Sequence, residues 1–205
     1  MFKTQSGIIL LILDMKIIKS WVLPAIGFGC ILFFWQFLSF AALNLHEKAQ
    51  QYTPLQDSIC KVMQTFNLKE GGYMLPQPQP GLSAEDWESQ NAVFHQNHWV
   101  RMNYYTNRDV SMIKPLMLGF LSDLILGSCI LWILKQCTSA STFKYMLYAV
   151  CVGLITFLYI PLTNHIWFPS FDLWAYLLDA VVPFTAIGFL YGYLKTRHKK
   201  RETIS

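Results

Sequence analysis

Charged residues are scarce in this sequence of 205 residues, making up 14% of the chain against about a quarter in an average soluble domain. Apolar residues make up 54%. This composition excludes an intrinsically disordered chain and argues against an ordinary water-soluble domain. It predicts an integral membrane protein.

Lysine and arginine are absent from four long apolar windows, and this absence locates the predicted membrane spans. A helix needs about 20 mainly apolar residues to cross about 30 Å of hydrocarbon. Tryptophan and tyrosine lie near the ends of the windows, as is typical at membrane interfaces. The predicted fold is an all-α integral membrane protein with four transmembrane helices, at residues 21–45, 115–134, 145–167 and 173–194.

The basic residues are gathered on one side of these spans. Ten of the sixteen lysines and arginines lie in the segments 1–20, 135–144 and 195–205. By the positive-inside rule these segments are cytoplasmic, whereas residues 46–114 and the turn 168–172 are extracytoplasmic. The net charge of +4 thus reflects membrane topology and does not indicate nucleic-acid binding. The expected partners are the lipid bilayer and either a second copy or another membrane protein.

The start of the chain allows more than one interpretation. The apolar run from Gly7 to Leu13 is too short to span a membrane, and the basic stretch after Met15 resembles the start of a signal sequence. We therefore expect Met15 to be the natural start, with residues 1–14 preceding it. In the alternative, the first span is a cleaved signal peptide with a small-residue site at 39–41, but the span is longer than usual for such peptides.

Disulfide pairs are missing from the segment 46–114, because Cys60 is its single cysteine. That favours a bacterial inner membrane over a disulfide-bonded extracellular domain. The segment is predicted to be a small helical insertion, with a helix after a capping box at Thr53 and a second one over residues 83–95. Apolar residues recur at helical spacing in the first helix, at Leu55, Ile59, Val62, Met63 and Phe66. An α+β insertion is the alternative, if residues 72–75 pair with 100–105.

Catalytic motifs are also missing: the sequence has no phosphate-binding glycine-rich loop, no nucleophile elbow and no zinc-protease signature. We expect no cofactor and a protein that is not an enzyme. One enzymatic alternative stays open, a metal-dependent membrane enzyme that uses histidines of the insertion. His95 and His98 are its candidate ligands, because residues three apart can share a helical face.

Two acidic residues lie inside predicted spans, where an ionisable side chain is costly and tends to face the bundle interior. Asp123 and Asp179 each occur on a stripe of small residues, which predicts that they face neighbouring helices and meet there. The candidate partners of this intramembrane polar site are Gln36, Ser122 and Tyr176, with His46 and His165 at the outer ends of the spans. The site could handle a proton or cation, or it could only fasten the helices by hydrogen bonds.

Several stretches resemble those of small, uncharacterised bacterial inner-membrane proteins of the four-span type. These are FWQFLSF at 34–40, YTPLQD at 52–57, GGYMLPQP at 71–78 and GFLSD at 119–123. The resemblance implies the architecture and supplies no activity and no site residue. The leading function is therefore a non-enzymatic structural or interaction component of the membrane. The alternative is a small proton- or cation-coupled carrier that uses Asp123 and Asp179.

Overall fold

The protein folds into two units, which are described separately. The computed structural model describes residue 15 and residues 17–78, 80–94, 98–107, 111–138 and 141–204. One unit, called the helical bundle below, consists of the chain up to Gln51 and from Met112 onward. The other, called the small unit, runs from Tyr52 to Ser111.

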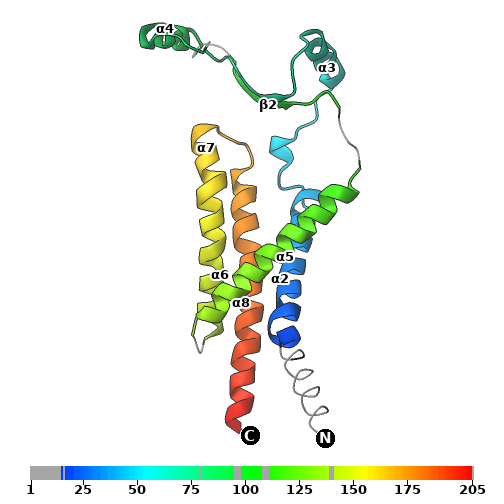
Figure 1. Ribbon diagram of the computed structural model, residues 1–205, viewed down its shortest axis with the longest axis vertical. Coiled ribbons are helices and arrows are strands. Elements are labelled where there is room, and N and C mark those ends of the chain that lie inside the picture. The colour runs from blue at the N-terminus through cyan, green and yellow to red at the C-terminus, as the bar shows by residue number, and fades with distance from the viewer. Residues whose placement is uncertain are drawn as a thin grey trace, which may run out of the picture. The chain divides into compact units, whose positions relative to one another are not determined.

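Long apolar helices build the bundle (Figure 1). The first is continuous from a π-helical turn η1 (Ile18–Val22) through α2 (Leu23–Phe37) to a second π-helical turn η2 (Leu38–Ala42). After the 3₁₀ turn η3 (Glu47–Ala49) and the small unit come α5 (Ile113–Gln136) and α6 (Thr142–Phe157). The helix α6 continues through the π-helical turn η4 (Leu158–Leu162) into α7 (Thr163–Trp167), and α8 (Leu173–Ile204) ends the described chain.

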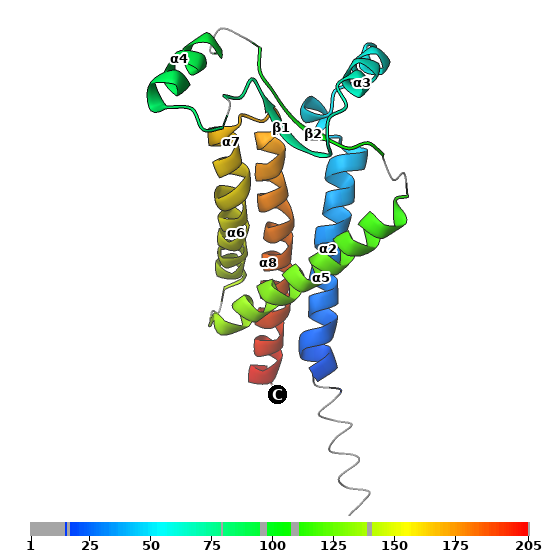
Figure 2. The same ribbon diagram turned by 45° about the horizontal axis from the view of Figure 1, so that its top comes forward.

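Four of these helical segments are long and apolar enough to cross a membrane, which confirms the predicted number. They are Ile18–Ala42, Ile113–Gln136, Thr142–Trp167 and Leu173–Arg197. The η2 turn finishes at the same end of the bundle at which α8 begins, and this end is called the His46 end below (Figure 2). Such a set of helices is compatible with a multi-pass membrane protein.

Close helix approaches depend on glycine at two crossings. A Cβ added at Gly127 of α5 would lie 2.7 Å from the backbone nitrogen of Gly29 in α2. A Cβ at Gly153 of α6 would overlap the carbonyl oxygen of Ala180 in α8. Small residues at such positions let two helix backbones touch. The structure thus pairs α2 with α5, and α6 with α8.

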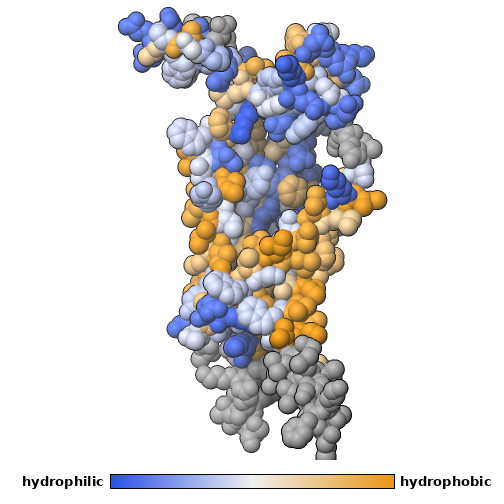
Figure 3. All heavy atoms as spheres, in the orientation of Figure 1, coloured by the Kyte–Doolittle hydropathy of each residue, from blue (hydrophilic) through white to orange (hydrophobic). Residues whose placement is uncertain are grey.

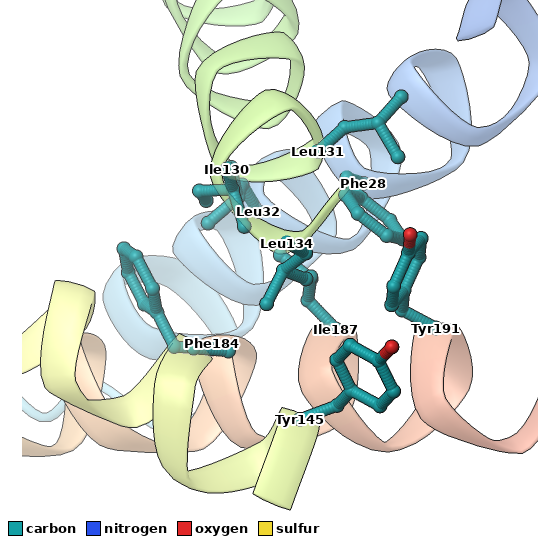
Figure 4. Packing of buried hydrophobic residues seen from close by; sticks show 10 residues of the cluster. Phe28, Leu32, Ile130, Leu131, Leu134, Tyr145, Phe184, Ile187 and Tyr191 are labelled. Carbon is teal, nitrogen blue, oxygen red and sulfur yellow. The ribbon is translucent and has the colours of Figure 1, made fainter. Parts of the chain in front are cut away.

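The apolar core joins these pairs through residues of the last turns of α5, the first turn of α6 and the second half of the membrane-spanning part of α8 (Figure 4). Phe28 of α2 meets Tyr191 of α8 edge to face, with the ring centroids 6.3 Å apart. Tyr145 of α6 packs on Tyr191 in the same manner at 5.1 Å. Further core residues are fully or almost fully buried, namely Leu32, Ile130, Leu131, Leu134, Phe184 and Ile187. The described core draws on α2, α5, α6 and α8.

The small unit contains a two-stranded antiparallel sheet and two helices. Strand β1 (Gly71–Leu75) pairs with β2 (Val100–Tyr104), and Gly71 lies opposite Tyr104. Helix α3 (Gln56–Thr65) begins two residues later than a cap at Thr53 would place it. Its N-cap residue is Leu55. Helix α4 (Ala84–Phe94) is capped by Ser83, whose hydroxyl accepts a hydrogen bond from the Asp86 backbone nitrogen at 3.2 Å.

Candidate functional site: a buried histidine between two aspartates

A sharp turn at the His46 end of the bundle places His46 against α8. The η2 helix ends at Ala42, and Asn44 takes a left-handed conformation with φ of 49°. Asparagine tolerates that conformation better than most residues. The Leu45 backbone nitrogen then donates to the Ser39 carbonyl oxygen at 2.9 Å, which folds the chain back over η2. As a result the His46 side chain is buried, with 2% of its surface exposed.

Both ring nitrogens of His46 contact carboxylates. The Nδ1 atom lies 2.8 Å from Oδ2 of Asp172, and Nε2 lies 3.0 Å from Oδ2 of Asp179. Asp172 immediately precedes α8, while Asp179 lies in its second turn, so that the two carboxylates face the same side of α8. These three residues are called the His46 cluster below.

Aromatic residues enclose the His46 cluster. The Phe40 ring stacks on the imidazole with a centroid distance of 3.9 Å, and Tyr176 of α8 meets it edge to face at 4.8 Å. The indole Nε1 of Trp35 donates a hydrogen bond of 2.9 Å to Oδ1 of Asp179. Trp35 and Phe40, which join the cluster to the first helix, both lie in the last two turns of that helix.

The geometry fixes how many protons the cluster holds. A neutral imidazole has one N–H donor and one acceptor nitrogen, so it cannot donate to two carboxylates at once. Either His46 is an imidazolium between two carboxylates, or a neutral His46 accepts a hydrogen bond from one protonated aspartate. In both forms the three groups share two protons and carry a net charge of −1. Loss of one proton would leave a nitrogen lone pair facing a carboxylate oxygen.

Asp123 forms a second polar site, on α5. The amide of Gln36 donates to Oδ1 of Asp123 at 3.0 Å, whereas the buried Oδ2 has no hydrogen-bond partner among the described residues. Asp123 is 3% exposed. The hydrogen bonds of Asp123 and Asp179 go to different partners, since neighbouring residues of α2, Gln36 and Trp35, donate to them. Each aspartate is thus bonded to the same helix, α2, from a different residue, and their direct meeting stays a prediction.

Hydrophilic residues lie set back within the upper half of the bundle, between apolar flanks (Figure 3). The sequence supplies no lysine or arginine in residues 20–47 or 168–194, the segments that carry the His46 cluster. Buried charges are costly unless they are paired. Within these segments the His46 ring is therefore the one basic group that can pair with Asp172 and Asp179.

Among the described residues, no hydrogen bond links the remaining sequence-predicted residues to either site. Ser122 is exposed, and its hydroxyl donates to the Leu118 carbonyl oxygen in its own helix. His165 accepts a hydrogen bond from the Ser170 backbone nitrogen at 3.0 Å, in the turn between α7 and α8. His98 is exposed, and His95 falls outside the described residues. Within the described part of the chain, no cluster of three His, Cys, Asp or Glu is arranged to hold a metal ion.

Sequence reasoning missed three members of the site. The hydropathy pattern places Asp172 in a turn and Trp35 and Phe40 inside an apolar span. A signal was available for Asp172, because it lies seven residues, about two helical turns, before Asp179. That spacing puts both on one helical face if the helix is extended backward by one residue.

Comparisons with protein-family models, with curated proteins and with solved structures found no match.

Proposed function

We propose that the protein is a small proton-coupled carrier of the bacterial inner membrane, with both termini in the cytoplasm. Four helices of sufficient length and apolarity support the membrane placement. The concentration of basic residues in 1–20, 135–144 and 195–205 supports the orientation. In this orientation the His46 end of the bundle faces outward.

The observation that carries the proposal is the pair of contacts from the two nitrogens of His46 to two aspartates. Histidine and aspartate side chains buried in a bundle of membrane-spanning helices are typical of proton relays. The cluster shares two protons among three groups. Because Trp35 donates to Oδ1 of Asp179, a proton bound to that aspartate is expected on Oδ2, facing His46.

Asp123 supplies a second proton-binding position. Its Oδ2 is buried without a partner, and a buried carboxylate oxygen in that situation is the atom to which a proton binds. Trp35 and Gln36 donate to the two sites from consecutive positions of α2. We propose that a movement of this helix couples the protonation of one site to the other.

The second candidate function is a non-enzymatic structural component, in which the His46 cluster only holds α8 against the first helix. The near-complete burial of His46 and its full set of partners favour this alternative. A structural component that binds its partner through the small-residue stripes beside Asp123 and Asp179 is disfavoured, since Gly127 and Ala175 of these stripes are buried within the chain. A carrier must bind and release protons at the cluster. In a purely structural role, the cluster keeps one protonation state.

The experiment that separates the two is a ¹⁵N NMR titration of the His46 ring, with the full chain in nanodiscs, from about pH 5 to 9. A carrier predicts that both ring nitrogens change state within this range. Asp179→Asn should hold His46 neutral throughout, because the new amide can donate to Nε2 while its oxygen still accepts from Trp35. The His165 ring, which has no hydrogen bond to Asp179 in the described chain, is the internal control, and its ¹⁵N signals should be the same in both proteins. A wild-type His46 signal that stays constant over the whole range would exclude the carrier.

A further inference from the structure

Helix α3 of the small unit presents an apolar face that its own unit leaves uncovered. Leu55, Ile59, Val62 and Phe66 are spaced four, three and four residues apart, and more than half of each side chain is exposed. At 100° per residue, these four positions fall within an arc of about 60°. Leu55 and Phe66 flank α3, so the face runs along the entire helix.

The other faces of α3 have different surroundings. Cys60, Met63 and Gln64 line a pocket of about 950 Å³ together with residues 102–107, which include the end of β2. The polar residues Asp57 and Lys61 lie roughly opposite the apolar arc. On that flank the end of β2 faces α3 across the pocket, whereas the apolar arc lies outside the pocket and stays uncovered.

We infer that the apolar arc of α3 lies in the headgroup region of a lipid bilayer, and this inference rests on the proposed membrane placement. The chain itself supports a lipid partner. Thirteen residues, 43–55, separate Ala42 at the end of the first candidate span from α3. Eight residues, 105–112, separate β2 from the second candidate span at Ile113. At about 3.4 Å per residue these segments reach at most about 45 and 27 Å, which tethers the small unit to the membrane surface.

The charge pattern also matches a lipid interface. A helix that binds a membrane in its plane buries one apolar side and keeps its polar side in water. Between Gln56 and Thr65, α3 carries one acidic residue, Asp57, and one basic residue, Lys61. Apolar burial therefore drives the binding, which will not depend on anionic lipid. Tyr52 precedes α3 and is 77% exposed, as is typical of an aromatic residue at the headgroup level.

The test places a nitroxide label on either side of α3, in the full chain with its native cysteines replaced by serine. Ile59→Cys puts the label on the apolar arc, and Asp57→Cys, two residues away, puts it on the opposite side. Phe34→Cys labels an exposed apolar position of α2 and reports whether the bundle is in lipid. Electron paramagnetic resonance in phosphatidylcholine nanodiscs then measures collision with oxygen, which enters lipid, and with a water-soluble nickel complex.

The expected result is a severalfold higher ratio of oxygen to nickel collisions at position 59 than at position 57, unchanged when phosphatidylglycerol is added. Equal ratios at 57 and 59, with position 34 in lipid, would overturn the inference and leave the membrane placement intact. A water-exposed label at position 34 would overturn both. A label at position 59 that is shielded from both reagents and broadened by a second label would instead identify another copy of the chain as the partner.

Discussion

Two acidic sites in the same bundle differ in how completely their oxygens are bonded. Asp179 has a hydrogen bond or ion pair at each carboxylate oxygen, from Trp35 and His46. Asp123 has one hydrogen bond, from Gln36, and one buried oxygen without a partner in the described chain. Asp123 is nevertheless the more deeply buried of the two.

The difference shows what each site can contribute. Satisfied buried polar groups hold helices together, and removing one partner leaves the others unpaired. A partly satisfied buried group lowers stability, so its presence calls for an explanation other than folding. The His46 cluster can therefore both fasten α8 to the first helix and bind protons, whereas Asp123 contributes chiefly as a proton-binding group.

Removing His46 should have the largest effect on stability. His46→Ala leaves two aspartates facing each other in a buried site, and loss of one partner from a buried ion pair costs about 3–5 kcal/mol. His165→Ala is the matched control, since it removes only the contacts of the His165 Nδ1 atom with Ser170 in the turn before α8 and should cost about 1 kcal/mol. Unfolding free energies measured in mixed micelles would give both values. Equal losses of unfolding free energy in the two variants would contradict the idea that the cluster holds α8 to the first helix.

Replacing each aspartate by leucine should separate the satisfied site from the unsatisfied one. Asp179→Leu leaves the Trp35 indole and the His46 ring without their acceptor, at about 1–3 kcal/mol for each group. Asp123→Leu removes an oxygen that has no partner and leaves a single donor, Gln36, without its acceptor, so the loss should be the smaller of the two, at about 1–3 kcal/mol. The same unfolding assay applies. A greater loss in Asp123→Leu than in Asp179→Leu would reverse our comparison.

The smallest expected effect concerns a third carboxylate, Glu70, which lies outside the bundle. Glu70 is exposed, and the hydroxyl and backbone nitrogen of Thr106 both donate to it, which lowers the pKa of Glu70. Its stabilising contribution is therefore complete above the unfolded-state pKa and is lost as the pH falls through the lower, folded-state pKa. Thr106→Val removes the hydroxyl and should raise the pKa of Glu70 toward its ordinary value in an NMR titration. Thr53→Val, which alters a threonine outside this contact, should leave it unchanged.

The four apolar helices could be predicted because a hydrocarbon layer imposes both length and composition on every segment that crosses it. For the His46 cluster, the sequence indicates His46 and Tyr176 as candidate partners of Asp179, and both lie there in the structure. The contact with Asp172 could not be predicted, since His46 and Asp172 are 126 residues apart and both lie in short connections between helices. Their meeting depends on a left-handed turn at Asn44 that hydropathy does not report. For Asp123, sequence reasoning identified Gln36 as a candidate partner but offered no means to foresee the unpartnered oxygen.

The π-helical turn η2 carries a consequence for insertions and deletions. Its backbone bond from Leu43 to the Leu38 carbonyl oxygen spans five residues instead of four, so the turn holds one more residue than a regular α-helix would use. Deleting one residue from Leu38–Ala42 would restore regular winding and rotate everything after it by about 100° relative to Trp35. His46 would then point away from α8. This stretch should therefore tolerate substitutions far better than changes in its length.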